Sequence, residues 1–89
     1  MNWKIEFDKK AKNEFLNLDS QAKKRIIKFI DDRLIKSENP RIYGAPLKGH
    51  LSGLWKYRVG TYRLICQVED SILTILVVSV GHRKAIYKP

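Results

Sequence analysis

Two kinds of hydrophobic periodicity follow one another along the chain. Between residues 8 and 36, apolar side chains return every three or four positions, as on one face of an α-helix. After residue 53 they return at every second position, as in half-buried β-strands. The interval 37–53 lies between these parts and contains two prolines and three glycines. The pattern therefore predicts helices first and strands afterwards, joined by a loop.

A short strand and two helices are predicted before the loop. Residues 3–7 alternate between apolar and polar side chains, as expected for the strand. Asp8 can cap the first helix, and Asp19 or Ser20 can cap the second. Each helix has one apolar face, formed by Ala11, Phe15 and Leu18 in the first and by Ala22, Ile26, Phe29 or Ile30, and Leu34 in the second.

Three strands are predicted after the loop, at about 54–59, 62–69 and 72–80. Gly60 and Thr61 separate the first two strands and suit a two-residue hairpin turn, in which glycine accepts a positive φ. This turn fixes the register of the hairpin. The expected pairs are Val59 with Tyr62, Arg58 with Arg63, Tyr57 with Leu64, Lys56 with Ile65 and Trp55 with Cys66.

The hairpin register sorts its side chains onto two faces of the sheet. The apolar face is predicted to pack on the helices and consists of Trp55, Tyr57, Val59, Tyr62, Leu64, Cys66 and Val68. The other face carries Lys56, Arg58 and Arg63, with the two arginines opposite each other, which costs stability. Three cations that converge without an obvious carboxylate indicate an anion site. The alternative is a solvent-facing pair that splays into water or is held by Glu69.

The end of the chain adds further basic and aromatic residues, among them His82, Arg83, Lys84 and Tyr87. Such an ending is typical of an RNA-binding edge, because cations hold phosphates and a ring can stack on a splayed base. A solvated C-terminus is the alternative. His82 is a possible acid or base, since imidazole titrates nearest to neutral pH, but it could equally cap the last strand.

The chain carries a net charge of +9, and its distribution favours a polyanionic partner. Residues 46–89 contain seven basic and only two acidic side chains. RNA, DNA or an acidic protein would complement such a surface, although a solvated basic face is also possible. Hydrophobic residues make up 44% of the chain, which excludes a disordered protein.

Length and cysteine content limit what the chain can be. Eighty-nine residues predict one domain, spanning 1–89, with an α+β fold: a strand, a two-helix hairpin and a three-stranded antiparallel meander. The single cysteine, Cys66, predicts a buried thiol without a disulfide, a metal site or any other cofactor. The N-terminus lacks the apolar run of a signal peptide, so a cytoplasmic protein with no membrane contact is expected.

Three segments together resemble toxins of the RelE/ParE superfamily, in particular its RelE-like branch. They are Pro46-Leu47-Lys48-Gly49, the hairpin Leu54–Leu64 (LWKYRVGTYRL) and the ending Ser79–Tyr87 (SVGHRKAIY). The resemblance covers the whole chain in element order. It implies a twisted antiparallel sheet packed on two helices, resembling microbial ribonucleases. It also implies a toxin with a cognate antitoxin that enters the A site of the 30S ribosomal subunit and cuts messenger RNA there.

The resemblance also assigns roles to residues of this chain. The family's catalytic positions fall on Lys56, Arg58, Arg63, Arg83 and Tyr87. Crowding by two guanidinium groups favours a neutral Lys56, which makes it the candidate base, with Arg58 assisting. Arg63 and Arg83 would stabilise charge on the phosphate, and Tyr87 would orient or stack the substrate. Contacts to RNA or the ribosome are expected from Lys48, Lys84 and Lys88.

The ending departs from the family pattern in two ways. Tyr87 follows Arg83 by only four positions, so His82 could take over part of the work of Tyr87, and no C-terminal helix follows. Two other functions are compatible with this fold or with this basic surface. One is a ParE-like inhibitor of DNA gyrase, which needs no active site, and the other is a non-catalytic RNA-binding module. The cationic set on the open sheet face argues against the first of these.

Overall fold

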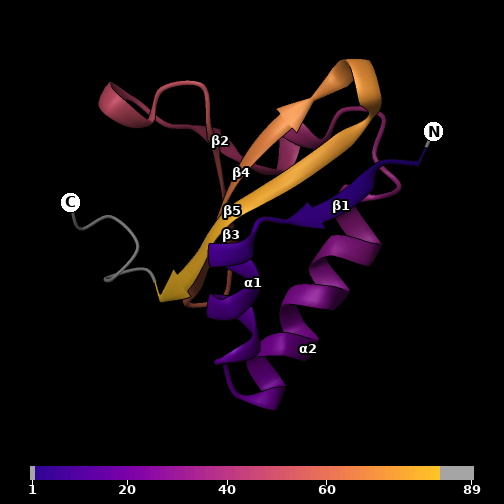
Figure 1. Ribbon diagram of the computed structural model, residues 1–89. Coiled ribbons are helices and arrows are strands. Elements are labelled where there is room, and N and C mark those ends of the chain that lie inside the picture. The colour runs from indigo at the N-terminus through magenta and orange to yellow at the C-terminus, as the bar shows by residue number, and fades with distance from the viewer. Residues whose placement is uncertain (1, 83–89) are drawn as a thin grey trace.

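The computed structural model of the protein describes residues 2–82 (Figure 1). Its helices and strands confirm the predicted order of one strand, two helices and three strands. The elements are β1 (Lys4–Phe7), α1 (Lys9–Leu16), α2 (Ser20–Phe29), β2 (Ala45–Pro46), β3 (Trp55–Val59), β4 (Tyr62–Glu69) and β5 (Thr74–His82). Short 3₁₀ turns at Pro40–Tyr43, Gly49–Leu51 and Asp70–Ile72 lie in the connections.

The strands form a single five-stranded sheet in the order β1-β5-β4-β3-β2. The meander of β3, β4 and β5 is antiparallel, as predicted. The sheet as a whole is mixed, however, because β1 runs parallel to β5. The antiparallel arrangement that the resemblance implies therefore holds for β2 to β5 but not for β1. Parallel pairing needs a long crossover, and all the other elements described for residues 2–82 lie between these two strands.

The additional strand β2 was not predicted from the sequence. Its two residues pair with β3, with Ala45 opposite Lys56 and Pro46 opposite Trp55. A strand of two residues has no alternation to detect, and proline is normally found in strands only at the edge of a sheet. Here β2 does form the edge next to β3.

Both helices begin at the predicted aspartates. The Asp8 carboxylate accepts a hydrogen bond from the Ala11 backbone N–H, and Asp19 accepts one from Ala22, each at 2.8 Å. These bonds satisfy N–H groups that have no partner within a helix. Helix α2 continues into a π-helical turn, Ile30–Leu34, which carries the helical run to the predicted Leu34.

The two helices cover one face of the sheet, and the core lies between them (Figure 1). Apolar side chains of α2, the π-helical turn and the three long strands meet there with Trp3 and Ala11. The buried cluster comprises Trp3, Ala11, Ile26, Ile30, Leu34, Tyr57, Val59, Leu64, Cys66, Ile75, Val77 and Val80. Within residues 2–82 no helix is both long enough and apolar enough to cross a membrane.

The last strand contains a β-bulge that was not predicted from the sequence. Cys66 pairs with Val77, but the preceding residue, Ile65, pairs with Ser79, so that Val78 is an extra residue. Because of this bulge, Val77 and Val80 can both face the core although they are three residues apart. The strand also begins at Thr74 rather than at the predicted residue 72 and extends to His82.

Candidate active site

The β3–β4 hairpin has the predicted turn and register. Gly60 adopts a φ of 60°, as its place in the two-residue turn requires. All five predicted pairs are present, including Arg58 opposite Arg63 and Lys56 opposite Ile65. Lys56, Arg58 and Arg63 therefore lie together on the sheet face opposite to the helices. We refer to these three residues as the cationic face.

Arg63 is the unusual member of the cationic face. Only 5% of its surface is exposed, and its Nε and Nη1 atoms have no hydrogen-bond partner among residues 2–82. The alternative of a solvated pair, or of a pair held by Glu69, was therefore wrong for Arg63. The Glu69 carboxylate accepts instead from the Gln67 side chain, at 2.9 Å. Burying a cation with unsatisfied donors costs stability, and an anion bound at this guanidinium would offset that cost.

The other two cations of this face are more accessible than Arg63. Arg58 is exposed next to the last residue of β3, and Lys56 is half-buried two residues before it. A phosphate that reached the Arg63 donors would meet Arg58 directly across the hairpin. The arrangement can therefore hold a phosphate between guanidinium groups while Lys56 lies two residue pairs further along β3, on the same face.

His82 lies on the other face of the sheet. It pairs with Tyr62, and the two rings meet edge to face with centroids 6.0 Å apart. Tyr62 packs against the core on the helix side, whereas Gly81 is the residue opposite Arg63. The structure therefore does not bring the His82 imidazole together with the cationic face.

Tyr57 ties β3, the strand that carries Lys56 and Arg58, to the loop segment that contains Pro40. The buried Tyr57 hydroxyl donates a hydrogen bond to the Pro40 carbonyl, at 2.9 Å. Burial raises the pKa of this phenol, so it remains a donor. Gly44 lies so close to β3 that a Cβ there would be 2.7 Å from the Lys56 carbonyl oxygen.

A second tether joins the same loop to the β4–β5 turn. Arg41 donates from Nη1 and Nη2 to the two carboxylate oxygens of Asp70, at 3.0 and 2.7 Å. Its guanidinium also lies 5.8 Å from the centre of the Trp55 ring. The hydrogen bond from Arg41 holds the pKa of Asp70 below its ordinary value. Sequence reasoning missed these supports, because residues far apart in the chain form them.

The remaining predicted contact residues are only partly described. Lys48 is exposed and immediately precedes the 3₁₀ turn Gly49–Leu51 in the loop between β2 and β3. Arg83, Lys84, Tyr87 and Lys88 lie outside the described residues. Within residues 2–82, no group of three or more histidine, cysteine, aspartate or glutamate side chains could hold a metal ion.

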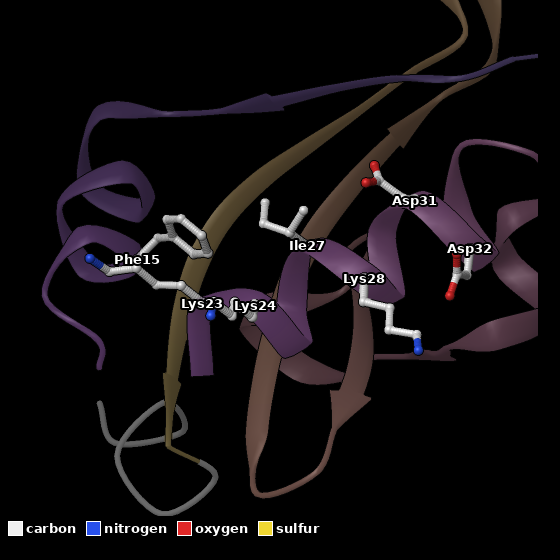
Figure 2. A pocket seen from close by; sticks show the side chains of 7 residues that line it. All are labelled: Phe15, Lys23, Lys24, Ile27, Lys28, Asp31 and Asp32. Carbon is white, nitrogen blue, oxygen red and sulfur yellow. The ribbon is translucent and has the colours of Figure 1, made fainter. Parts of the chain in front are cut away.

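A separate groove of about 500 Å³ lies on the helical side of the molecule (Figure 2). Figure 2 shows Phe15 of α1 and Ile27 of α2 beside it, with lysines and aspartates around them. The described residues that line it are Phe15, Lys23, Lys24, Ile27, Lys28, Asp31 and Asp32. Lys56, Arg58 and Arg63 do not line it, so the groove and the cationic face are different surfaces.

Comparisons with known proteins find relatives that match almost the whole chain. The family model described as "ParE toxin of type II toxin-antitoxin system, parDE" matches residues 5–87. Toxin RelG from Mycobacterium tuberculosis is 30% identical over 88 residues, which cover 99% of both chains. The mRNA interferase toxin RelE from Escherichia coli is 31% identical over 86 residues, covering 94% of this chain and 86% of that protein.

Solved structures of toxin–antitoxin complexes contain chains with a similar fold. A chain of the toxin–antitoxin complex RelBE2 from Mycobacterium tuberculosis superposes with a TM-score of 0.83 at 28% identity, covering 93% of this chain and all of that one. A chain of the intact RelBE toxin–antitoxin complex from Escherichia coli has a TM-score of 0.72 at 29% identity, with coverages of 90% and 95%.

Proposed function

Because the chain belongs to the family of ParE toxins of type II toxin–antitoxin systems, within the RelE/ParE superfamily, we propose that it is a RelE-like endoribonuclease. It would cut messenger RNA in the ribosomal A site. The observation that carries this proposal is the buried Arg63 guanidinium, whose Nε and Nη1 donors have no partner among residues 2–82. A phosphate between Arg63 and Arg58 would satisfy these donors and reduce the repulsion between the two cations.

The RelE-like function is favoured over gyrase inhibition by two observations. The relatives at 30% and 31% identity carry the names RelG and RelE, and the second is an mRNA interferase. A gyrase inhibitor that acts only by protein binding also has no need for an arginine buried without a carboxylate. A common fold would not by itself decide between them.

The proposed reaction is attack of a ribose 2′-oxygen on the adjacent phosphorus, with departure of the 5′-oxygen. Lys56 would accept the proton of the 2′-hydroxyl, assisted by Arg58. Arg63 and Arg83 would stabilise the negative charge that develops on the phosphoryl oxygens, and Arg83 would also donate a proton to the leaving oxygen. Tyr87 would orient or stack the substrate. His82 is not needed in this scheme, since it faces Tyr62.

The proposed site lacks a strong acid–base pair, so the ribosome should supply much of the rate by positioning the RNA. We therefore expect cleavage of mRNA on programmed 30S-containing ribosomes with an empty A site, and slow cleavage of free RNA. Mapping mRNA ends by primer extension, with a gyrase supercoiling assay in parallel, tests this. Inhibition of supercoiling without RNA cleavage would identify a ParE-like toxin. Equal cleavage of free and ribosome-bound RNA would contradict ribosome dependence.

The proposed partner that controls the toxin is a cognate antitoxin. Similar chains occur in the toxin–antitoxin complexes named above. An acidic or amphipathic segment over Arg58, Arg63 and Arg83 would gain both charge complementarity and apolar burial. Such a segment would compete with mRNA for the same guanidinium groups.

A further inference from the structure

The last part of β5 extends beyond its neighbour β1. The parallel pairing of these strands ends at Phe7 opposite Val77, and the Asp8 N–H then donates to the Val77 carbonyl at 3.0 Å. Strand β5 continues to His82, and on its other side it stays paired with β4. Among the residues that the structure describes, 78–82 therefore have a strand on one side only. Their N–H groups that point away from β4 need acceptors from elsewhere.

Glu14 of α1 supplies such an acceptor. Its Oε1 atom accepts a hydrogen bond from the Val80 backbone N–H at 2.9 Å and one from the Ser79 hydroxyl at 3.3 Å. Its Oε2 atom lies 3.9 Å from the Lys10 ammonium, one helical turn away. Helix α1 packs against β5 through the buried Ala11, which brings Glu14 to the strand edge (Figure 1). The carboxylate thus takes the place that a longer β1 would occupy.

The residues that Glu14 holds come directly after the bulge at Val78. A bulge makes two registers possible for the residues that follow it, and a slip by one position would turn every side chain to the other face. In the observed register Leu64 faces Val80, Arg63 faces Gly81 and Tyr62 faces His82. The bonds to Ser79 and Val80 secure this register just before the strand passes Arg63.

We infer that Glu14 is a positioning residue that fixes the end of β5 beside the buried Arg63. This inference rests on the proposed ribonuclease function for its effect on catalysis. Arg63 would keep its orientation only while Gly81, which has no side chain, stays opposite to it.

The test compares Glu14→Ala with Glu14→Gln in single-turnover mRNA cleavage on programmed ribosomes at saturating toxin. Glu14→Ala should lower the cleavage rate by about 10- to 100-fold, since a displacement of about 1 Å can cost that much, and change ribosome affinity by less than about 2-fold. Glu14→Gln keeps an oxygen acceptor for the Val80 N–H and should recover most of the rate. Asp19→Ala is the matched control, because it removes another carboxylate bonded to a backbone N–H without contacting β5.

Amide hydrogen exchange separates this inference from the proposed function. In Glu14→Ala, exchange should accelerate at residues 79–82 and stay unchanged at residues 74–77, which β1 still covers. Unchanged exchange at 79–82, or a cleavage rate equal to that of Asp19→Ala, would overturn the positioning role. A wild-type protein that does not cleave mRNA would instead overturn the proposed function, and the exchange result alone would then decide whether Glu14 fixes the strand.

Discussion

Among single residues, Arg63 is buried at a cost to the stability of the fold, as the proposed anion site would require. Its guanidinium is buried opposite another arginine, and two of its nitrogen atoms have no acceptor within residues 2–82. Neither local propensity nor packing favours an arginine here, because an apolar side chain of similar length would fill the same space without a desolvation penalty. The cost is understandable if the natural occupant of the site is an anion.

Replacing Arg63 by methionine should therefore separate stability from activity. We expect Arg63→Met to be as stable as the wild type or more stable by about 1–4 kcal/mol, as found when buried charges are replaced by apolar groups. Single-turnover cleavage should fall by roughly 10²–10³, the loss typical of one preorganised donor. Urea unfolding and cleavage on programmed ribosomes measure the two effects. Arg33→Met is the charge-matched control, and a destabilised Arg63→Met would show that Arg63 supports the fold.

Arg83 and Lys84 allow a second comparison between neighbouring cations. Under the proposed mechanism, Arg83→Ala should lower single-turnover cleavage by roughly 10²–10³ with little change in ribosome affinity. Lys84→Ala should weaken association modestly and reduce its salt dependence by about one counterion. Cleavage rates are measured at saturating toxin, and affinities at several salt concentrations. Similar rates for both variants would make Arg83 an electrostatic anchor only.

At the scale of elements, the loop segment before β3 determines where that strand lies. Gly44 leaves no room for a side chain, since a Cβ would meet the Lys56 carbonyl oxygen at 2.7 Å and the Tyr57 ring at 2.9 Å. Gly44→Ala must push β3 away, so we expect a loss of about 1–3 kcal/mol in unfolding free energy and slower mRNA cleavage. Gly49→Ala is the control, because it has open space and only the strain of a positive φ. Wild-type cleavage by Gly44→Ala would contradict this coupling.

The tether between Arg41 and Asp70 should respond to acid. The pKa of Asp70 is lowered from 3.8 by the hydrogen bond from Arg41, so this carboxylate binds protons more readily in the unfolded chain. Its contribution to stability is present above pH 3.8 and is lost as the pH falls through the lowered pKa. The difference in urea midpoint between wild type and Asp70→Asn should therefore shrink below about pH 4. A difference that stays constant down to pH 2 would contradict this assignment.

The elements also show which parts of the fold the sequence could predict. Local signals were sufficient for the caps at Asp8 and Asp19 and for the hairpin turn at Gly60, because a few adjacent residues determine each of them. The parallel pairing of β1 with β5 depends on residues about 70 positions apart, for which no local signal exists. The bulge did leave a trace, since Ser79 occupies a position where strict alternation requires an apolar residue.

In the candidate site too, some features are determined by adjacent residues and others by residues far apart in the chain. The hairpin register was enough to place Lys56, Arg58 and Arg63 on one face, because alternation and a two-residue turn leave one arrangement. It could not show that Arg63 is buried while Arg58 is exposed, or that His82 lies on the opposite face. Those properties depend on the packing of β5 after the bulge. The contact of Glu14 with Val80 likewise joins residues 66 positions apart.

For the whole molecule, the two distinct surfaces raise the question of where an antitoxin binds. The cationic face carries positive charge only, whereas the groove beside α1 and α2 has apolar side chains with both lysines and aspartates around them. An acidic segment that covers the cationic face would block mRNA directly. A segment in the groove would leave the cationic face open, because none of its residues lines that groove.

Two charge-introducing variants should distinguish these binding modes. Arg58→Glu should weaken antitoxin binding by at least 10-fold and make it less dependent on salt, because a paired charge at an interface is replaced by a repulsive one. Ile27→Asp places a carboxylate on the exposed apolar residue of the groove and should change the affinity by less than about 3-fold. Calorimetric titration of each variant with the cognate antitoxin measures both effects, and circular dichroism verifies folding. If Ile27→Asp were the variant that loses affinity, the antitoxin would bind on the helical side and would have to inhibit cleavage without covering Arg58.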